Sequence, residues 1–200
     1  HCIGRTTDMS SIDSEHFCSH GGPSWLSGHM ASLQATVLKR AARKIAGSHG
    51  HEVMRPVGDG TETQFPLAYV RTGPRGKVPV LMVPGGPGLA SVLPYRSLRR
   101  RAEHAGLDVL MMEHRGVGLS RRDLHGNELP SEAVTVDHVV EDLAAVLDDA
   151  GVERVIVYGS SYGTYLAQGF GVRYPDRVVG MVLDSPMLSV ADDIEGARSY

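Results

Sequence analysis

The residues best placed to do chemistry lie in the run Gly159-Ser160-Ser161-Tyr162-Gly163. Strand-forming residues 155–158 precede this Gly-x-Ser-x-Gly pattern, and a helix-like segment, residues 164–173, follows it. A strand, a tight turn and a helix around a serine make a nucleophile elbow, with Ser161 as the nucleophile. Gly159 and Gly163 are needed because the turn is strained and side chains on either side of the serine would collide. The pattern therefore predicts acyl transfer through Ser161, with the positive end of the helix favouring the developing negative charge.

A glycine-rich loop, Pro84-Gly85-Gly86-Pro87-Gly88, follows an apolar run at residues 78–83. Ligands of open α/β sheets bind beyond the carboxyl ends of the strands, so this loop should face the elbow. We expect the N–H groups of Gly86 and Tyr162 to form an oxyanion hole, with Gly85 and Gly88 in support. Gly86 is preferred because Pro87 has no N–H and glycine lets the backbone approach a substrate closely.

A second loop, residues 113–120, follows the apolar run 107–112. Arg115 in this loop is expected to brace neighbouring loops through hydrogen bonds to their carbonyls, and to contact substrate only secondarily. The spacing of Gly86 and Gly88, with Glu113 ending the next strand, also imitates a dinucleotide-binding fingerprint. Ser91 replaces the third glycine of that fingerprint and the elbow stays unexplained, so acyl transfer is the better interpretation.

The elements that must position these loops alternate between strand and helix. Two short strands, residues 51–55 and 64–71, predict an antiparallel edge hairpin. Further strands are predicted over 78–83, 107–112, 154–158 and 178–183, and helices over 91–105, 135–150 and 164–173. Apolar strands separated by helices predict a parallel sheet covered on both faces.

Composition excludes several other classes of function. The 200 residues are 42% hydrophobic with a net charge of −3, which suits one globular domain and gives no reason to expect nucleic acid as a partner. No apolar run approaches the ~20 residues that would span a membrane. Both cysteines, Cys2 and Cys18, lie at the N-terminus, so the core has no disulfide, which favours a reducing, cytoplasmic location.

The N-terminal 46 residues are expected to be peripheral. Residues 1–29 show no hydrophobic period and are interpreted as vector-derived or upstream sequence, whereas residues 31–46 predict a basic amphipathic helix. This helix would pack on the domain or lie in solvent rather than on a membrane. His49 and His51 lack a third ligand at a recognisable spacing, so no metal site is predicted.

Three motifs together resemble the α/β-hydrolase serine peptidases, namely the proline iminopeptidases and, more closely, the tripeptidyl-aminopeptidase-like branch. They are residues 84–88, 115–120 and 159–167, and residues 174–178 also resemble the link that follows the elbow helix in this family. The resemblance covers about residues 50–190. It implies an α/β-hydrolase fold, a peptide or ester substrate, and no metal or cofactor. Where the family usually has Asp before the Arg-Gly pair, this chain has Glu113-His114.

The general base is the missing part of this site. The triad of this fold runs in the order Ser, acid, His, yet all ten histidines precede Ser161, the last being His138. The sequence is therefore expected to be the N-terminal part of a longer protein, with residues 47–186 in the core and 187–200 beginning a cap. Asp184 could be the acid of the triad, placed one strand early, but the simpler interpretation is a loop residue. His114 would be the first candidate for a base within the chain. The expected function is a serine hydrolase that works through an acyl-enzyme, first an aminopeptidase acting on short peptides. The alternatives are a carboxylester hydrolase and a non-enzymatic binding protein with this fold.

Overall fold

The computed structural model describes residues 46–86 and 88–187, together with Val37, Arg40 and Lys44. Val37, Arg40, Lys44 and Ala46 are helical, and the first three are exposed whereas Ala46 is buried. The rest of the helix expected over residues 31–46 lies outside the described residues. So do the segment 1–29 and nearly all of the segment assigned to the start of a cap.

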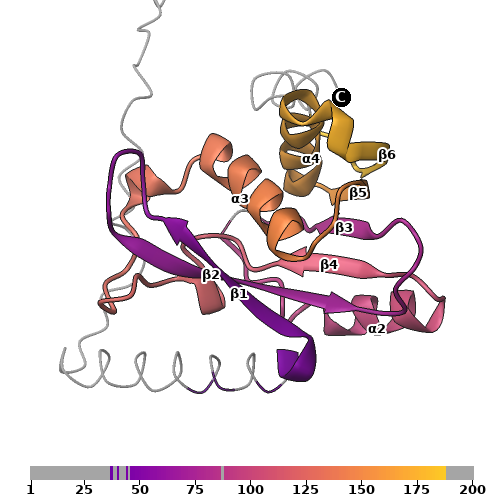
Figure 1. Ribbon diagram of the computed structural model, residues 1–200, viewed down its shortest axis with the longest axis horizontal. Helices are drawn as coiled ribbons and strands as arrows, with labels where there is room; N and C mark the ends of the chain where they lie inside the picture. The colour runs from indigo at the N-terminus through magenta and orange to yellow at the C-terminus, as the bar shows by residue number, and fades with distance from the viewer. Residues whose placement is uncertain (1–36, 38–39, 41–43, 45, 87, 188–200) are drawn as a thin grey trace, which may run out of the picture. The chain divides into compact units, whose positions relative to one another are not determined.

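Six strands form one mixed sheet in the described part of the chain (Figure 1). The order is β1-β2-β4-β3-β5-β6. β1 pairs antiparallel with β2, and β2 pairs antiparallel with β4, whereas β4, β3, β5 and β6 run parallel to one another. The antiparallel hairpin ahead of a parallel sheet is as predicted. The bounds are β1 Gly50–Pro56, β2 Gln64–Thr72, β3 Val80–Val83, β4 Val109–Met112, β5 Val155–Ser160 and β6 Val178–Asp184.

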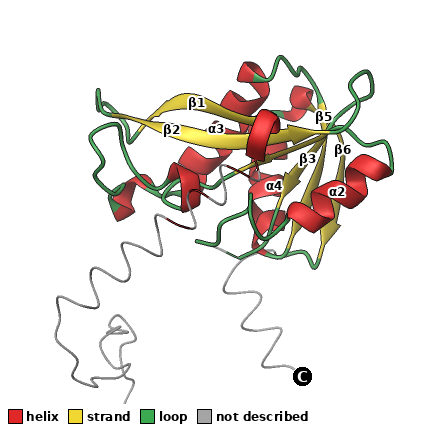
Figure 2. Ribbon diagram, turned by 90° about the horizontal axis from the view of Figure 1, so that it is seen from below, coloured by secondary structure: helices red, strands yellow, loops and turns green. Residues whose placement is uncertain are grey.

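Helices cover both faces of this sheet, which confirms the layered architecture. On one face, Leu81, Leu110 and Val157 pack in a single core with helices α3 (Val136–Asp149) and α4 (Tyr162–Arg173). The alternate residues of the same strands, among them Met82 and Met111, pack on the other face with helix α2 (Arg96–His104). Figure 1 shows α2 on the opposite side of the sheet from α3 and α4, and Figure 2 shows it lying across the parallel strands. Side chains alternate because successive residues of a strand point to opposite faces.

Two helices begin at other residues than the pattern predicted. α2 begins at Arg96 instead of residue 91, because Pro94 disfavours helical geometry in the residue before it and residues 91–95 form turns. α4 begins at Tyr162, directly after Ser161, instead of at residue 164. The elbow therefore passes into the helix without a linker.

A buried ion pair joins the loop after β4 to α3. Asp142 of α3 is fully buried, and its two carboxylate oxygens accept from Nε and Nη2 of Arg115 at 2.7 and 2.8 Å. The remaining nitrogen of Arg115 donates to the carbonyls of Val57 and Ala133. Arg55 of β1 donates to the same Asp142 from a partly buried position. One carboxylate thus holds the edge hairpin, the second loop and α3 together.

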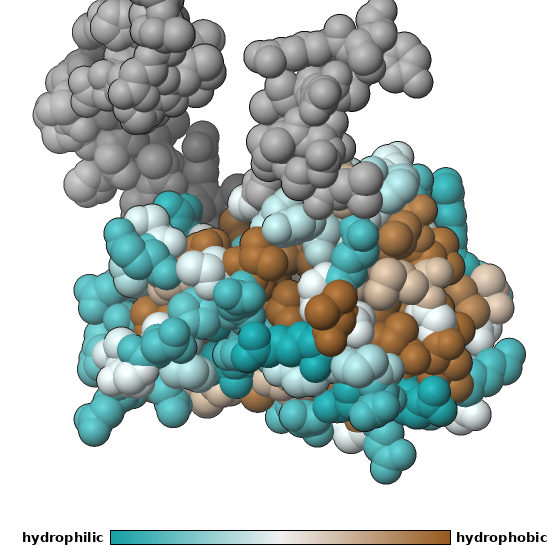
Figure 3. All heavy atoms as spheres, turned by 90° about the horizontal axis from the view of Figure 1, so that it is seen from above, coloured by the Kyte–Doolittle hydropathy of each residue, from teal (hydrophilic) through white to brown (hydrophobic). Residues whose placement is uncertain are grey.

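β6 lies at the edge of the sheet opposite the hairpin. Its Val179 and Val182 are exposed, as are Val172 and Tyr165 of the adjacent α4. Figure 3 shows apolar side chains gathered on the side of the molecule where α4 and β6 lie in Figure 1. No helix in the described part of the chain is both long and apolar enough to cross a membrane.

We expect Asp142→Ala to lower the free energy of unfolding by about 3–5 kcal/mol, because the buried guanidinium of Arg115 and the partly buried one of Arg55 would lose their carboxylate. The matched control is its neighbour in sequence, Glu141→Ala, which removes a more exposed ion pair to Arg173 and should cost at most about 1 kcal/mol. Guanidinium chloride titrations followed by circular dichroism would measure both. Equal losses in the two variants would contradict the bracing role of the buried pair.

Candidate active site

Ser161 occupies the sharp turn between β5 and α4. Its φ of 50° and ψ of −123° place a non-glycine residue in a backbone conformation that side chains rarely adopt, and its side chain is exposed. Such strain, of order 1–3 kcal/mol, persists only where the surroundings enforce it. The amide of Ser161 donates to the carbonyl of Asp184 at the end of β6 at 2.8 Å. The strained turn at the carboxyl edge of the parallel strands is what the sequence predicted.

Glycines make the turn sterically feasible. A Cβ on Gly163 would lie 2.0 Å from the carbonyl oxygen of Val83, and one on Gly159 would lie 2.6 Å from that of Gly163. A Cβ on Gly85 would lie 3.0 Å from Cβ of Ser161. The elbow therefore packs backbone to backbone against the end of β3, and the loop after β3 begins directly beside the serine.

The two N–H groups expected to form an oxyanion hole belong to residues that line one small hollow. Gly86, with a φ of 81°, and Tyr162 both line it, together with Gly85. Tyr162 is the first residue of α4, so its N–H has no acceptor within the helix. Gly88 lies further along the loop, exposed and outside the hollow, and Pro87 is outside the described residues.

The loop after β3 is held at its far end by two buried charged side chains. Oε2 of the fully buried Glu113 accepts from the amides of Ser91 and Val92 at 2.9 and 2.7 Å, and also from the Ser91 hydroxyl. Arg99 of α2 donates to the carbonyls of the same two residues. Burial lowers the pKa of Arg99, and the nearby carboxylate of Glu113 opposes that shift.

Sequence reasoning assigned no role to this anchor. Glu113 entered only as a departure from the family pattern and as the acidic residue of a dinucleotide fingerprint. The fingerprint interpretation fails because the carboxylate is buried and bound to the loop. The sequence offers one indication of this anchor. An acidic residue, Glu113, ends one strand, and a serine, Ser91, follows the glycine-rich loop after the neighbouring strand. Nothing in the sequence separates Arg99 from the exposed arginines beside it in α2.

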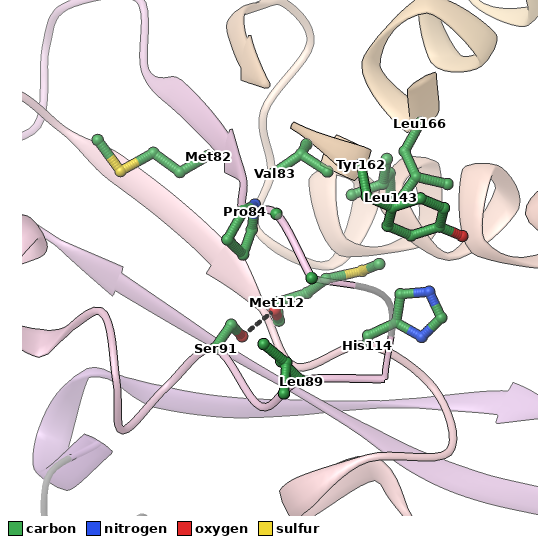
Figure 4. A pocket seen from close by; sticks show the side chains of 12 residues that line it. Met82, Val83, Pro84, Leu89, Ser91, Met112, His114, Leu143, Tyr162 and Leu166 are labelled. Atoms are coloured by element: carbon green, nitrogen blue, oxygen red, sulfur yellow. Dashed lines mark hydrogen bonds between the residues drawn. The ribbon is translucent and has the colours of Figure 1, made fainter. Parts of the chain in front are cut away.

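His114 contributes the ring that faces the hollow from the loop after β4 (Figure 4). Its Nδ1 lies 2.8 Å from the carbonyl oxygen of Arg115, and its Nε2 is buried without a hydrogen-bond partner among the described residues. The ring centroid is 6.4 Å from that of Tyr162. Burial lowers the pKa of His114, an effect that the charge of Arg115 reinforces and that the Nδ1 hydrogen bond and Asp142 oppose.

Asp184 lies at the same edge, opposite Ser160 in the β5–β6 register. Its exposed carboxylate accepts from the hydroxyl of Tyr158 at 2.9 Å, and this hydrogen bond raises the pKa of Tyr158. No histidine in the described part of the chain hydrogen-bonds the carboxylate of Asp184 or the hydroxyl of Ser161. The last histidine, His138, instead contacts Ala133 and Asp59. In the described part of the chain, Ser161, Gly85 and Tyr162 thus lie together at one sheet edge with no histidine hydrogen-bonded to Ser161.

Comparison with known proteins agrees with this geometry. The family model described as alpha/beta hydrolase fold matches residues 78–198. A probable proline iminopeptidase of Streptomyces coelicolor is 30% identical over 138 residues, which cover 69% of this chain and 39% of that protein. A proline iminopeptidase of Thermoplasma volcanium is 32% identical over 57% of this chain and 36% of its own length. The chain thus spans less than half the length of these relatives.

Solved structures share the fold. Epoxide hydrolase A of Mycobacterium thermoresistibile superposes with a TM-score of 0.53 at 26% identity, covering 75% of this chain and 44% of that chain. A thermophilic esterase of Thermogutta terrifontis superposes with a TM-score of 0.55 at 24% identity over 74% of this chain and 51% of its own. The family match spans more than half of the sequence and contains the elbow, the loop after β3 and the sheet edge that joins them. The chain therefore belongs to the alpha/beta hydrolase fold family, whose members include proline iminopeptidases.

Proposed function

We propose that the protein is a serine hydrolase that works through an acyl-enzyme on Ser161 and acts as an aminopeptidase on short peptides. The observation that carries the proposal is the exposed, strained Ser161, which lies against Gly85 of the glycine-rich loop and directly precedes the first N–H of α4. Two relatives named as proline iminopeptidases support the peptidase assignment. A carboxylester hydrolase would use the same elbow, so substrate assays need both bond types.

The proposed reaction has two halves. Ser161 Oγ attacks the carbonyl carbon of the scissile amide while a general base takes its proton. The N–H groups of Gly86 and Tyr162 donate to the oxyanion of the tetrahedral intermediate. The protonated base then gives its proton to the leaving amine as the C–N bond breaks, which leaves an ester on Ser161. Water, deprotonated by the same base, hydrolyses that ester and frees the serine.

The base in this proposal is a histidine of the natural protein that is not among these 200 residues. All ten histidines of this chain precede Ser161, whereas in this fold the histidine follows the nucleophile. Asp184 is a candidate for the acid that orients it, because it ends the strand next to the elbow. The assignment of Ser161 as the nucleophile does not depend on the role of Asp184.

The first prediction concerns Ser161→Ala in the protein extended to its natural C-terminus. Removal of the nucleophile should abolish labelling by a fluorophosphonate and lower kcat by about 10⁴- to 10⁶-fold. Ser160→Ala is the matched control, because Ser160 ends β5 one residue earlier. This variant should keep both the fluorophosphonate labelling and the kcat of the wild type. Persistent labelling of Ser161→Ala would refute the assignment of the nucleophile.

The second prediction concerns the 200-residue chain itself. Without a positioned base, its Ser161 hydroxyl should be a poor nucleophile, so turnover of peptides and esters should be close to background. Assays of both substrate types at equal protein concentration, beside the extended protein, would measure the difference. Turnover at comparable rates would show that a base lies within these residues.

The third prediction concerns the anchor of the loop after β3. We expect Glu113→Ala to lower kcat by at least about 10-fold, because the loop that carries Gly86 would lose its acceptor and Arg99 its buried counter-charge. Glu113→Gln retains a side-chain oxygen acceptor and should lose less. Glu128→Ala, on the exposed surface, is the control and should leave kcat unchanged. The role is refuted if Glu113→Ala folds and retains full kcat.

A further inference from the structure

The hydroxyl of Thr164 joins the elbow to the loop after β6. Thr164 is the third residue of α4 and is fully buried. Its Oγ1 donates to the carbonyl oxygen of Ser161 at 2.6 Å and accepts from the amide of Met187 at 2.8 Å. Because an amide N–H can only donate, the single proton of the hydroxyl points at Ser161. The hydroxyl therefore has one orientation, set by a partner on each side.

The loop after β6 is itself held against α4 at both ends. At its start, the amide of Ser161 donates to the carbonyl of Asp184 at 2.8 Å. At Met187, the carbonyl accepts from Nε2 of Gln168, one turn further along α4, at 2.9 Å. Met187 therefore has a fixed place from which its amide holds the Thr164 hydroxyl.

The peptide unit between Ser161 and Tyr162 links this hydroxyl to the candidate oxyanion hole. The unit is trans and planar, so its C=O and its N–H point in opposite directions. The C=O is that of Ser161, and it accepts from both the amide and the hydroxyl of Thr164, at 2.8 and 2.6 Å. The N–H is that of Tyr162. Any tilt of the carbonyl would tilt this N–H by the same angle, so the contacts of Thr164 set its direction.

Threonine hydroxyls bond carbonyls of the preceding turn in many helices, and there the bond is local. Here the carbonyl belongs to the peptide that carries a candidate oxyanion donor, and a second segment of the chain holds the hydroxyl in place. A hydrogen bond to the C=O of a peptide also polarises its N–H and makes that N–H a stronger donor. The Thr164 hydroxyl thus acts on both the direction and the strength of the Tyr162 N–H.

We propose that Thr164 is a positioning residue, whose hydroxyl orients the Ser161–Tyr162 peptide so that the Tyr162 N–H points at the oxyanion. This inference rests on the proposed function, in which Ser161 is the nucleophile and Tyr162 stabilises the tetrahedral intermediate. The oxyanion forms only on the way through that intermediate. A misdirected N–H therefore weakens binding of the transition state and leaves binding of the substrate unchanged.

The test uses the protein extended to its natural C-terminus. Thr164→Val keeps the shape of the side chain without the hydroxyl, and it should lower kcat about 10-fold with KM within about twofold of wild type. The assays use p-nitrophenyl acetate and prolyl p-nitroanilide, and the rate of fluorophosphonate labelling should fall by a similar factor. The end point of labelling counts the folded active sites, so a partly unfolded sample is not mistaken for a slow one. Thr164→Ser keeps the hydroxyl and should stay within about threefold of wild type.

Gln168→Met is the matched control for the loop after β6. It releases the carbonyl of Met187 but leaves the Thr164 hydroxyl in place, so kcat and the labelling rate should match those of wild type. Equal losses in Thr164→Val and Gln168→Met would overturn the proposal in favour of simple anchoring of the loop. Full kcat and labelling rate in Thr164→Val, or no recovery in Thr164→Ser, would also overturn it. Thr164→Ala provides the same comparison if the valine variant does not fold.

A measurement independent of turnover follows the peptide itself. The ¹⁵N signal of the Tyr162 amide, recorded on tyrosine-labelled extended protein and assigned through Tyr162→Phe, reports hydrogen bonding at the Ser161 carbonyl. It should move upfield in Thr164→Val and stay in place in Gln168→Met. An unchanged signal in Thr164→Val would overturn the proposal even if Ser161 proves to be the nucleophile. A wild type with neither fluorophosphonate labelling nor turnover would instead refute the serine hydrolase assignment, and this proposal with it.

Discussion

The close approach of two backbone segments, the elbow and the end of β3, is the constraint on which the site depends. Gly163 lies so near the carbonyl oxygen of Val83 that any side chain there would force the two apart. This contact holds Ser161 in its strained conformation and brings Gly85 against the serine. Because backbone atoms cannot change rotamer, the contact fixes Ser161 relative to the loop more firmly than a side-chain contact could.

Buried charged side chains position the two loops, in addition to the backbone contact between the elbow and β3. Glu113 and Arg99 hold the amides and carbonyls of Ser91 and Val92, so the loop after β3 is fixed at both ends. Arg115 and Asp142 do the same for the second loop by tying it to α3. Apolar packing would also fill these places, but only directional hydrogen bonds set the orientation of a loop backbone. The paired charges therefore keep the desolvation cost of burial moderate while they position the loops.

The fold alone does not determine which substrate a protein of this family accepts. Relatives of similar identity to this chain are named as a probable proline iminopeptidase, a 2-hydroxy-6-oxononadienedioate/2-hydroxy-6-oxononatrienedioate hydrolase of Burkholderia vietnamiensis and an epoxide hydrolase of Siraitia grosvenorii. Function therefore resides in the site and the groups around it. Among the described residues, the polar side chains that line the small hollow beside the elbow are Ser91, His114 and Tyr162.

The sequence by itself determined the architecture and the position of the strained turn at Ser161. Alternating apolar runs predicted the hairpin, the parallel strands and the helices on both faces, because side-chain periodicity follows directly from local backbone geometry. The Gly-x-Ser-x-Gly pattern predicted the strained turn, since only its glycines permit that packing. The early start of α4 and the late start of α2 were missed because helix ends depend on local turns such as that at Pro94.

Only the tertiary structure decided which charged residues are buried and what they hold. Arg99 lies among exposed arginines, and Asp142 lies between an exposed-face glutamate and a buried leucine, so neither local pattern identifies a buried partner. Their partners are 7 to 87 residues away in sequence and meet them only when the sheet and helices pack. The lowered pKa of His114 has the same origin, because its ring is buried beside Tyr162 of α4. Local sequence specifies backbone conformation, whereas desolvation and hydrogen-bond pairing arise from contacts that only the folded chain creates.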